Sequence, residues 1–209
     1  MCVIIRLMKT AALILNGTYI PPKIDGGYVL CADGGFNLLQ TIGGKCDAVL
    51  GDCDSINDLP SNIKLIPYPK AKNETDGYLA VLYLLSEGYK RINIYGALGG
   101  RADMAMGNIE LLAVARHLGI EAVIYDKGTE IRFISSGETL CLKCKKGDTI
   151  SVLPYTDSIA FIHSNGLAYP LDGLTIERLS SRGMSNAATE ESVTMEVKTG
   201  KAFVYITSQ

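Results

Sequence analysis

YVLCADGGFNLLQTIG (28–43) is the stretch from which the fold of this chain is predicted, because it contains a strand, a tight turn and a helix in succession. The apolar run YVLCAD (28–33) predicts a strand that ends at Asp33, and the following FNLLQTIG predicts a helix. Gly34 and Gly35 between them let the backbone turn sharply. In a parallel α/β sheet such a turn lies at the carboxyl edge, where ligands bind. One unit of this kind is weak evidence, since Asp-Gly-Gly is also an ordinary turn at the end of a strand.

The same alternation of strand and helix continues to about residue 125. Helical patterns follow at DGYLAVLYLLSEG (76–88) and MGNIELLAVARHLG (106–119), and Gly119 ends the second of them. Further apolar runs that predict strands lie at 11–16, 47–52, 64–69, 92–97 and 121–126. Short connections between such elements predict a mostly parallel, Rossmann-like sheet with helices on both faces, a three-layer α/β/α domain.

The pattern changes after Asp126. The remaining segments are short and strand-like, with turn residues between them, and the last two apolar runs predict a hairpin that turns at Thr199 and Gly200. Strands at this spacing predict a small antiparallel β-sandwich or barrel. We therefore expect an α/β domain over residues 1–127 and a β-rich domain over residues 128–209.

The composition excludes several classes of protein. The chain has 209 residues, 47% of them hydrophobic, and its formal charge of −2 argues against binding to nucleic acid or to an anionic membrane. None of its apolar runs approaches the roughly 20 residues that span a bilayer. The start, MCVIIRLMKTAALIL, is interrupted by Arg6 and Lys9 and is not expected to be a signal peptide. The CxxC pair Cys141 and Cys144 has no second ligand pair at zinc spacing. We expect a cytoplasmic protein with reduced thiols.

Acidic residues recur along the first half, each just after an apolar run or at the start of the next helix: Asp33, Asp52, Asp54, Asp76 and Asp103. Carboxylates gathered at one sheet edge repel one another unless a cation holds them, and oxygen-only ligands suit Mg²⁺, which usually accompanies phosphates. In LGDCDSI (50–56) two aspartates stand two residues apart, so in an extended loop both face the same way. That spacing favours metal binding, although capping of the next helix is the alternative.

Two further motifs place positive charge near these acids. In PKAKNETDGYLA (69–80), Thr75 and Asp76 open a helix, which capping explains well, while Lys70 and Lys72 precede it. In YGALGGRADMAMGN (95–108), Arg101 is suited to bidentate contact with phosphate, and a surface arginine with a capping aspartate is the alternative. The chain contains neither GxxxxGK[ST] nor GxGxxG after its first strand, which argues against the common NTPases and simple NAD dehydrogenases.

Taken together, these motifs resemble the thiamine pyrophosphokinase family. The resemblance is carried by ADGGFN, GDCDS, NETD and GGRAD in that order, and in the second half by SNGLAYPL (164–171) and SRGMSNAATEESVTMEVKTGKAFVY (181–205). It implies transfer of a pyrophosphoryl group from the co-substrate ATP to the hydroxyl of thiamine, giving thiamine diphosphate and AMP. It also implies dependence on Mg²⁺, and a homodimer with thiamine pockets at the subunit interface, roofed by the β-rich domains, which would thus bind thiamine and take part in dimerisation.

The resemblance also assigns residues to roles. The Mg²⁺ ligands and catalytic carboxylates would be Asp52, Asp54 and Asp76, with Arg101 as the catalytic cation. The ATP phosphates would be held or approached by Asp33, Gly34, Gly35, Asn37, Lys72, Thr75, Arg101 and Asp103. Thiamine would be contacted by Tyr169, Ser185 and Asn186.

Two positions depart from the family pattern. Met104 stands where the family often has histidine, and Asn73 where it often has aspartate. These departures leave two alternatives open: a catalytically silent nucleotide- or thiamine-binding protein on the same scaffold, and another Mg²⁺-dependent nucleotidyl-processing enzyme. Because Asp52, Asp54 and Asp76 are retained, we expect an active enzyme.

Overall fold

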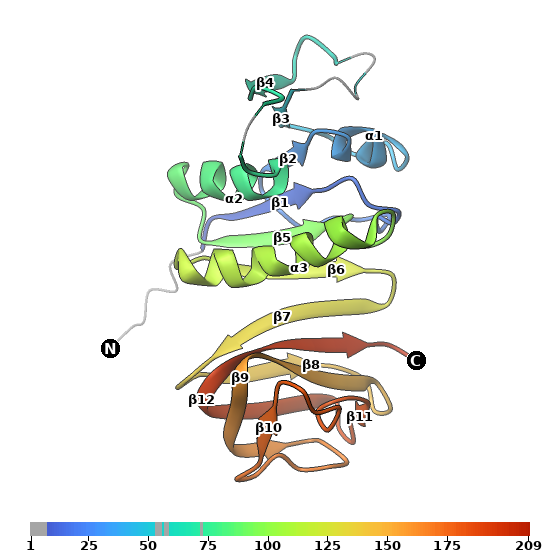
Figure 1. Ribbon diagram of the computed structural model, residues 1–209. Coiled ribbons are helices and arrows are strands. Elements are labelled where there is room, and N and C mark those ends of the chain that lie inside the picture. Colours follow the sequence, from blue (N-terminus) through green and yellow to red (C-terminus); the bar gives the residue numbers. More distant parts are fainter. Residues whose placement is uncertain (1–7, 53–55, 57–58, 72) are drawn as a thin grey trace, which may run out of the picture. The chain divides into compact units, whose positions relative to one another are not determined.

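The computed structural model describes residues 8–52, 56, 59–71 and 73–209. The chain divides into two compact units, Met1–Lys127 (unit 1) and Gly128–Gln209 (unit 2), which Figure 1 shows in the blue-to-yellow and yellow-to-red parts of the ribbon. Unit 1 alternates strands with helices, and unit 2 is built from strands. The predicted fold class, a parallel α/β domain followed by a small antiparallel β domain, is confirmed.

Unit 1 contains a parallel sheet whose strands follow the order β4-β3-β2-β1-β5-β6. Each neighbouring pair is parallel, including β1 with both β2 and β5. The strand order therefore reverses direction between β1 and β5, which is the switch point of the sheet. The strand bounds are β1 Thr10–Ile14, β2 Val29–Ala32, β3 Ala48–Gly51, β4 Lys64–Pro67, β5 Arg91–Tyr95 and β6 Glu121–Asp126.

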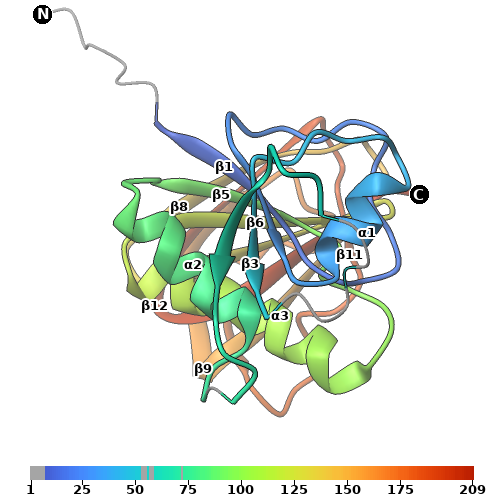
Figure 2. The ribbon, with the colours of Figure 1, turned by 90° about the horizontal axis from the view of Figure 1, so that it is seen from above.

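The helices of unit 1 cover the two faces of this sheet. Helix α1 (Gly35–Gln40) packs Phe36 and Leu39 in one hydrophobic cluster with Ala12 and Ile14 of β1. Helices α2 (Asp76–Ser86) and α3 (Ala102–His117) pack together on the other face, and Figure 2 shows α1 and α2 on opposite sides of β3. Within the described residues, no helix combines the length and apolar character needed to cross a membrane.

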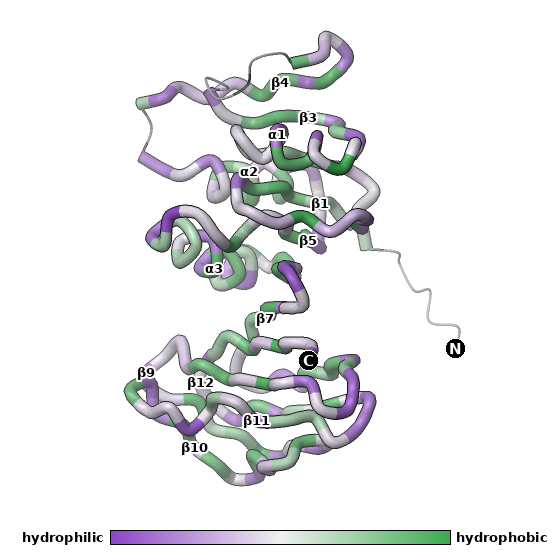
Figure 3. The backbone as a smooth tube through the Cα atoms, turned by 90° about the vertical axis from the view of Figure 1, so that its right-hand side faces the viewer, coloured by the Kyte–Doolittle hydropathy of each residue, from purple (hydrophilic) through white to green (hydrophobic). Residues whose placement is uncertain are grey.

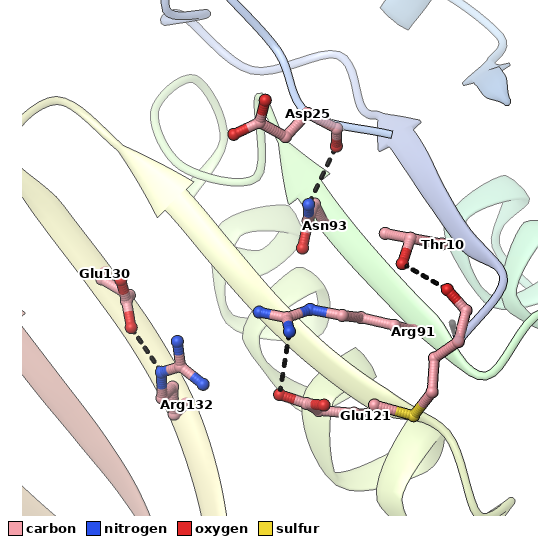
Figure 4. Close-up of polar contacts among 8 residues, drawn as sticks. Thr10, Asp25, Arg91, Asn93, Glu121, Glu130 and Arg132 are labelled. Atoms are coloured by element: carbon pink, nitrogen blue, oxygen red, sulfur yellow. Dashed lines mark hydrogen bonds and ion pairs between the residues drawn. The ribbon is translucent and has the colours of Figure 1, made fainter. Parts of the chain in front are cut away.

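Buried polar contacts hold the long connection between β1 and β2 against the sheet. Asn93, only 5% exposed in the middle of β5, donates from Nδ2 to the carbonyl of Asp25 at 2.8 Å (Figure 4). The amide of Asp25 donates to the hydroxyl of Tyr95 at 2.9 Å. Because the connection between β1 and β2 begins directly after β1, the bonds of Asn93 and Tyr95 also fix a loop that leads away from the carboxyl edge.

Figure 3 shows the apolar character concentrated in strands such as β1 and β3.

Unit 2 is an antiparallel assembly around the long strands β9 (Thr149–Asn165) and β12 (Ser192–Thr207). Strand β12 pairs with β7, β8 and β9, and β9 also pairs with β10 and β11. Their shared core includes Phe161, Ile159 and Val193, each at most 1% exposed. Burial of one such side chain contributes about 1.5–3 kcal/mol. The shorter strands are β7 Thr129–Ser135, β8 Thr139–Lys143, β10 Thr175–Glu177 and β11 Asn186–Ala187.

The predicted hairpin at Thr199 and Gly200 is wrong. Both residues lie inside β12 and pair with Ala160 and Ile159 of β9. The register shifts next to Gly200, which has φ +90°, and a Cβ on this residue would lie 2.2 Å from the carbonyl oxygen of Ser158. Glycine therefore serves a β-bulge with close backbone approach, which gives the same sequence signal as a turn. The two apolar runs that precede Gly166 likewise join into the single strand β9.

Candidate active site

Unit 1 contains a pocket of about 470 Å³ at the carboxyl edge of its sheet. The pocket lies at the switch point between β1 and β5, where open α/β sheets bind their ligands. Segments distant in the sequence meet there because the strands are parallel and their ends share one edge. The lining residues are Leu15 and Asn16 after β1, Ala32 and Asp33 at the end of β2, Thr75, Asp76 and Gly77 at the start of α2, and Gly99, Arg101, Met104 and Asn108 after β5.

Asp33 and Asp76 come together at Gly51. A Cβ on Gly51 would lie 3.2 Å from Cβ of Asp33 and 3.2 Å from Oδ1 of Asp76. Gly51 has φ +146° and Asp33 φ +42°, so the ends of β3 and β2 both have backbone conformations that most side chains avoid. The Asp33 amide is fixed by a 2.8 Å hydrogen bond to the carbonyl of Leu50. A non-glycine residue with positive φ, such as Asp33, costs about 1 kcal/mol or more of stability, and such residues cluster at functional sites.

Thr75 and Asp76 each have a structural role at the start of α2. Thr75 is the N-cap, and its hydroxyl accepts a hydrogen bond from the amide of Tyr78 at 3.3 Å. Asp76 lies in the first turn, where its charge is favourable to the helix dipole. The predicted capping is therefore confirmed for Thr75. Both residues also line the pocket, so capping and ligand binding are compatible here.

Arg101 and Asp103 form a bidentate ion pair at the start of α3. Nε and Nη2 of Arg101 lie 3.1 and 2.6 Å from the two carboxylate oxygens of Asp103. The guanidinium hydrogen bond, together with a 2.9 Å bond from the Met104 amide, lowers the pKa of the Asp103 carboxyl, and the pKa of Arg101 is raised. The side chains are 76% and 67% exposed, so solvent screens the pair. A phosphate can therefore replace Asp103 at Arg101 without uncovering a buried charge.

The remaining residues that the sequence assigns to Mg²⁺ or to the ATP phosphates do not line the pocket or lie outside the described residues. Asp52 is half-buried directly after β3, whereas Asp54 and Lys72 lie outside the described residues. Gly34 and Gly35 are buried, and a Cβ on Gly35 would lie 2.2 Å from the Ile14 carbonyl oxygen, so close packing of α1 on β1 already accounts for glycine there. Asn37 is exposed on α1 and does not line the pocket.

The described residues contain no group of three or more His, Cys, Asp or Glu side chains arranged to hold a metal ion. Asp54 lies outside the described residues. The set Asp52, Asp54 and Asp76 therefore stays a prediction.

The sequence reasoning missed Asn16 and Asn108. Asn16 is the last residue of the apolar run 11–16, so it stands at the end of a predicted strand, as several of the aspartates do. Asn108 lies on the face of α3 that also presents Met104 to the pocket, and its Nδ2 donates to the carbonyl of Ala97 at 2.8 Å. This bond ties the loop that carries Arg101 to helix α3.

In unit 2 the structure brings Tyr169, Ser185 and Asn186 together. Tyr169 is 73% exposed, and its amide and carbonyl both bond to the side chain of Asn186. Ser185 has φ +57°, and its amide donates to the hydroxyl of Ser151 at 3.0 Å. The result is an exposed aromatic ring on a loop whose backbone is held by a neighbouring amide side chain.

The structure is that of an α/β protein with a pocket beside carboxylates at the switch point of a parallel sheet, followed along the chain by an antiparallel β unit. Residues 25–124 match the family model described as thiamin pyrophosphokinase, catalytic domain, and residues 137–202 match thiamin pyrophosphokinase, vitamin B1 binding domain. A relative, thiamine pyrophosphokinase of Bacillus subtilis, is 30% identical over 169 residues, which cover 78% of this chain and 75% of that protein. The chain belongs to the thiamin pyrophosphokinase family.

Solved structures agree in fold. The crystal structure of thiamine pyrophosphokinase from Bacillus subtilis superposes with a TM-score of 0.85 at 24% identity, covering 96% of this chain and 100% of that one. The crystal structure of yeast thiamin pyrophosphokinase gives a TM-score of 0.75 at 15% identity, covering 96% and 86%. The family models and the 30% identical relative confirm the family resemblance drawn from the motifs.

Proposed function

We propose that this protein transfers the pyrophosphoryl group of ATP to the hydroxyl of thiamine, giving thiamine diphosphate and AMP. The observation that carries the proposal is the convergence of Asp33, Asp76 and Arg101, from three separate segments, on one pocket in a chain of this family. Carboxylates beside an arginine are the groups that a metal-bound polyphosphate needs. The pocket volume of about 470 Å³ lies in the range of small-ligand sites.

The carboxylates fit Mg²⁺ as the accompanying ion. Mg²⁺ is usually held by one or two carboxylates, water and substrate phosphates rather than by a cage of protein ligands. Asp33 and Asp76 meet at Gly51, so two carboxylates are close together, and Asp52 follows Gly51 directly in the chain. We propose Asp52, Asp54 and Asp76 as the ligands, with Asp33 beside them. A bound Mg²⁺ would neutralise phosphate charge and orient the polyphosphate.

The remaining residues position the reactants. Arg101 leaves Asp103 and binds phosphate oxygens, where its fixed charge stabilises the transferring group. A carboxylate oxygen of the aspartate group accepts the proton of the thiamine hydroxyl as it attacks the β-phosphorus in line. Because phosphoryl transfer is loose, positioning and electrostatics contribute more than a strong base. Met104 lines the pocket and carries no exchangeable proton, so the mechanism does not use a base at this position.

We place thiamine on unit 2 at the exposed ring of Tyr169, next to Ser185 and Asn186. An exposed tyrosine face suits both the aromatic rings and the positive charge of thiamine. We propose that the ATP phosphates lie in unit 1 at Thr75 and Arg101, which line the pocket beside Asp33. For Gly34, Gly35, Asn37, Lys72 and Asp103 a contact with phosphate stays a prediction.

We also propose a homodimer. Unit 2 exposes large apolar side chains, among them Leu179 (fully exposed), Ile162 and Met184 (each 50% exposed), which suits an interface better than a monomer surface. Light scattering after size exclusion, at several concentrations, measures the molar mass directly. The cytoplasmic location stays a prediction.

The decisive experiment incubates the purified protein with ATP, Mg²⁺ and thiamine and measures both AMP and thiamine diphosphate. We expect the two products in equal amounts and no turnover when EDTA removes the metal. ATP binding without AMP would identify a silent binding protein. AMP formed only with another acceptor would identify a different nucleotidyl-processing enzyme.

A further inference from the structure

The side chain of Asn186 forms a two-point clamp on the backbone of Tyr169. Its Oδ1 accepts from the Tyr169 amide at 3.0 Å, and its Nδ2 donates to the Tyr169 carbonyl at 2.6 Å. The same Oδ1 accepts from the amide of Ala187 at 2.9 Å. A carboxamide presents one acceptor and one donor side by side, as a peptide group does, so it can pair with both main-chain groups of one residue.

The clamp continues a short antiparallel pairing. Leu167 pairs with Ala188, the Ala168 amide donates to the Ala187 carbonyl at 2.9 Å, and the Thr189 amide donates to the Gly166 carbonyl at 2.8 Å. At Tyr169 the partner is the Asn186 side chain rather than another peptide group. Pro170 follows and restricts the preceding backbone to extended conformations. The backbone from which the Tyr169 ring projects is therefore held by Asn186.

The conformation on the other side of the clamp is also fixed. Ser185, just before Asn186, has φ +57°, and its amide bonds to the Ser151 hydroxyl on β9. Asn186 itself is half-buried, whereas Tyr169 is 73% exposed. The Asn186 amide is therefore hydrogen-bonded within the protein, whereas the Tyr169 side chain is exposed to solvent.

We propose that Asn186 is a positioning residue for thiamine, acting through the backbone of Tyr169. This inference rests on the proposed function, and it differs from direct contact between Asn186 and thiamine. Preorganised aromatic surfaces bind better because less freedom is lost on binding. The clamp should therefore affect thiamine affinity and leave ATP untouched.

A double-mutant cycle separates the two roles. Asn186→Asp keeps the shape and the acceptor but removes the donor, which leaves a carboxylate oxygen facing the Tyr169 carbonyl. We expect KM for thiamine to rise about tenfold, a change of about 1.4 kcal/mol, with KM for ATP within twofold. Tyr169→Ala keeps the clamped backbone and removes the ring. In that background Asn186→Asp should change KM for thiamine less than twofold, because the positioned ring is gone.

If the factors by which the two substitutions change KM for thiamine multiply in the double variant, Asn186 acts independently of the ring. That result would overturn the proposal. Asn165→Asp is the matched control, because it adds the same charge at an exposed position of the same unit. It should leave both KM values within twofold. A fall in KM for thiamine in both charge variants would also contradict the proposal, since it would show attraction of the cation rather than positioning.

Hydrogen exchange tests the clamp without any activity. In Asn186→Ala the Tyr169 amide should exchange at least tenfold faster, while the Leu171 amide, bonded to the Ser164 hydroxyl at 2.7 Å, keeps its protection. Unchanged exchange at Tyr169 would overturn the inference even in an active enzyme. Absence of thiamine diphosphate synthesis by the unaltered protein would instead overturn the proposed function, with the clamp still judged by exchange. If Asn186→Ala does not fold, the same exchange measurement on Asn186→Leu decides, because leucine has a similar size and lacks the acceptor for the Tyr169 amide.

Discussion

The two units position their candidate functional side chains by different physical means. In unit 1, Asp33, Asp76 and Arg101 come from three separate segments and meet because parallel strands share one carboxyl edge. In unit 2, Tyr169 is held by side chain–backbone hydrogen bonds from Asn186, seventeen residues away in the sequence. A substitution at the first site should therefore change the chemistry with little change in geometry. A substitution at the second should loosen geometry first.

The largest effect is expected for Asp76→Asn in unit 1. The change removes one charge at nearly constant shape, and the helix keeps its cap through Thr75. We expect kcat to fall at least about 100-fold, as when a preorganised electrostatic group is lost, while the free energy of unfolding changes by about 1 kcal/mol or less. AMP release and a denaturant titration measure the two quantities.

Glu110→Gln on the exposed side of α3 is the control for charge alone and should leave turnover unchanged. Near-normal kcat in Asp76→Asn would show that the shared sheet edge does not place a reacting group.

A smaller effect is expected when the frame of the same site is altered. In Gly51→Ala the new Cβ would lie 3.2 Å from both Asp33 Cβ and Asp76 Oδ1, at φ +146°. We expect kcat to fall about tenfold and the protein to lose about 1–3 kcal/mol of stability, because crowding and backbone strain both oppose the change. Steady-state kinetics and thermal unfolding measure the outcome.

Gly107→Ala is the matched control for the added methyl group. Gly107 lies inside α3 with nothing within 4 Å of a built Cβ, so alanine should stabilise the helix by about 0.5–1 kcal/mol. Equal kcat in the two variants would show that crowding at Gly51 does not reach the carboxylates.

For unit 1, the sequence was sufficient where local pattern determines structure. Alternating apolar runs predicted the parallel sheet, and the position of each aspartate after a run predicted the shared edge. The switch point between β1 and β5 could not be predicted in this way, because strand order depends on contacts between distant segments. Asn16 ends the first apolar run, but a single uncharged side chain there does not by itself indicate a metal or phosphate site. Asn108 needed the bond to Ala97, which no local pattern indicates.

For unit 2, local pattern was less informative. A glycine between two apolar runs predicts a turn and a bulge equally well, and only the pairing with β9 distinguishes them at Gly200. The family motif marked Ser185 and Asn186, yet their bonds to Ser151 and Tyr169 depend on the closed structure. Side chains that pair with a distant backbone leave no periodic signal in the sequence.

The smallest effect is expected at the second attachment of the Tyr169 loop. Asp172 bonds to Nδ1 of His163 and accepts from the Ser164 hydroxyl at 3.3 Å, and that hydroxyl holds the Leu171 amide. An ionised carboxylate only accepts, so Nδ1 of His163 carries the hydrogen. Asp172→Asn keeps an acceptor and loses the charge. Because Asn186 still clamps the loop, we expect KM for thiamine to rise about two- to threefold at constant kcat.

The pH dependence of Asp172→Asn sharpens the contrast with unit 1. The hydrogen bond from His163 lowers the pKa of the Asp172 carboxyl below its unfolded value of about 3.9. A lowered folded pKa means that the stabilisation is present above the unfolded value and is lost as pH falls through the folded one. The difference in melting temperature between the parent and the variant should therefore shrink as the pH falls from about 5 to below about 3.5. A difference that instead grows over this acid range would mean that Asp172 does not hold the loop as a carboxylate.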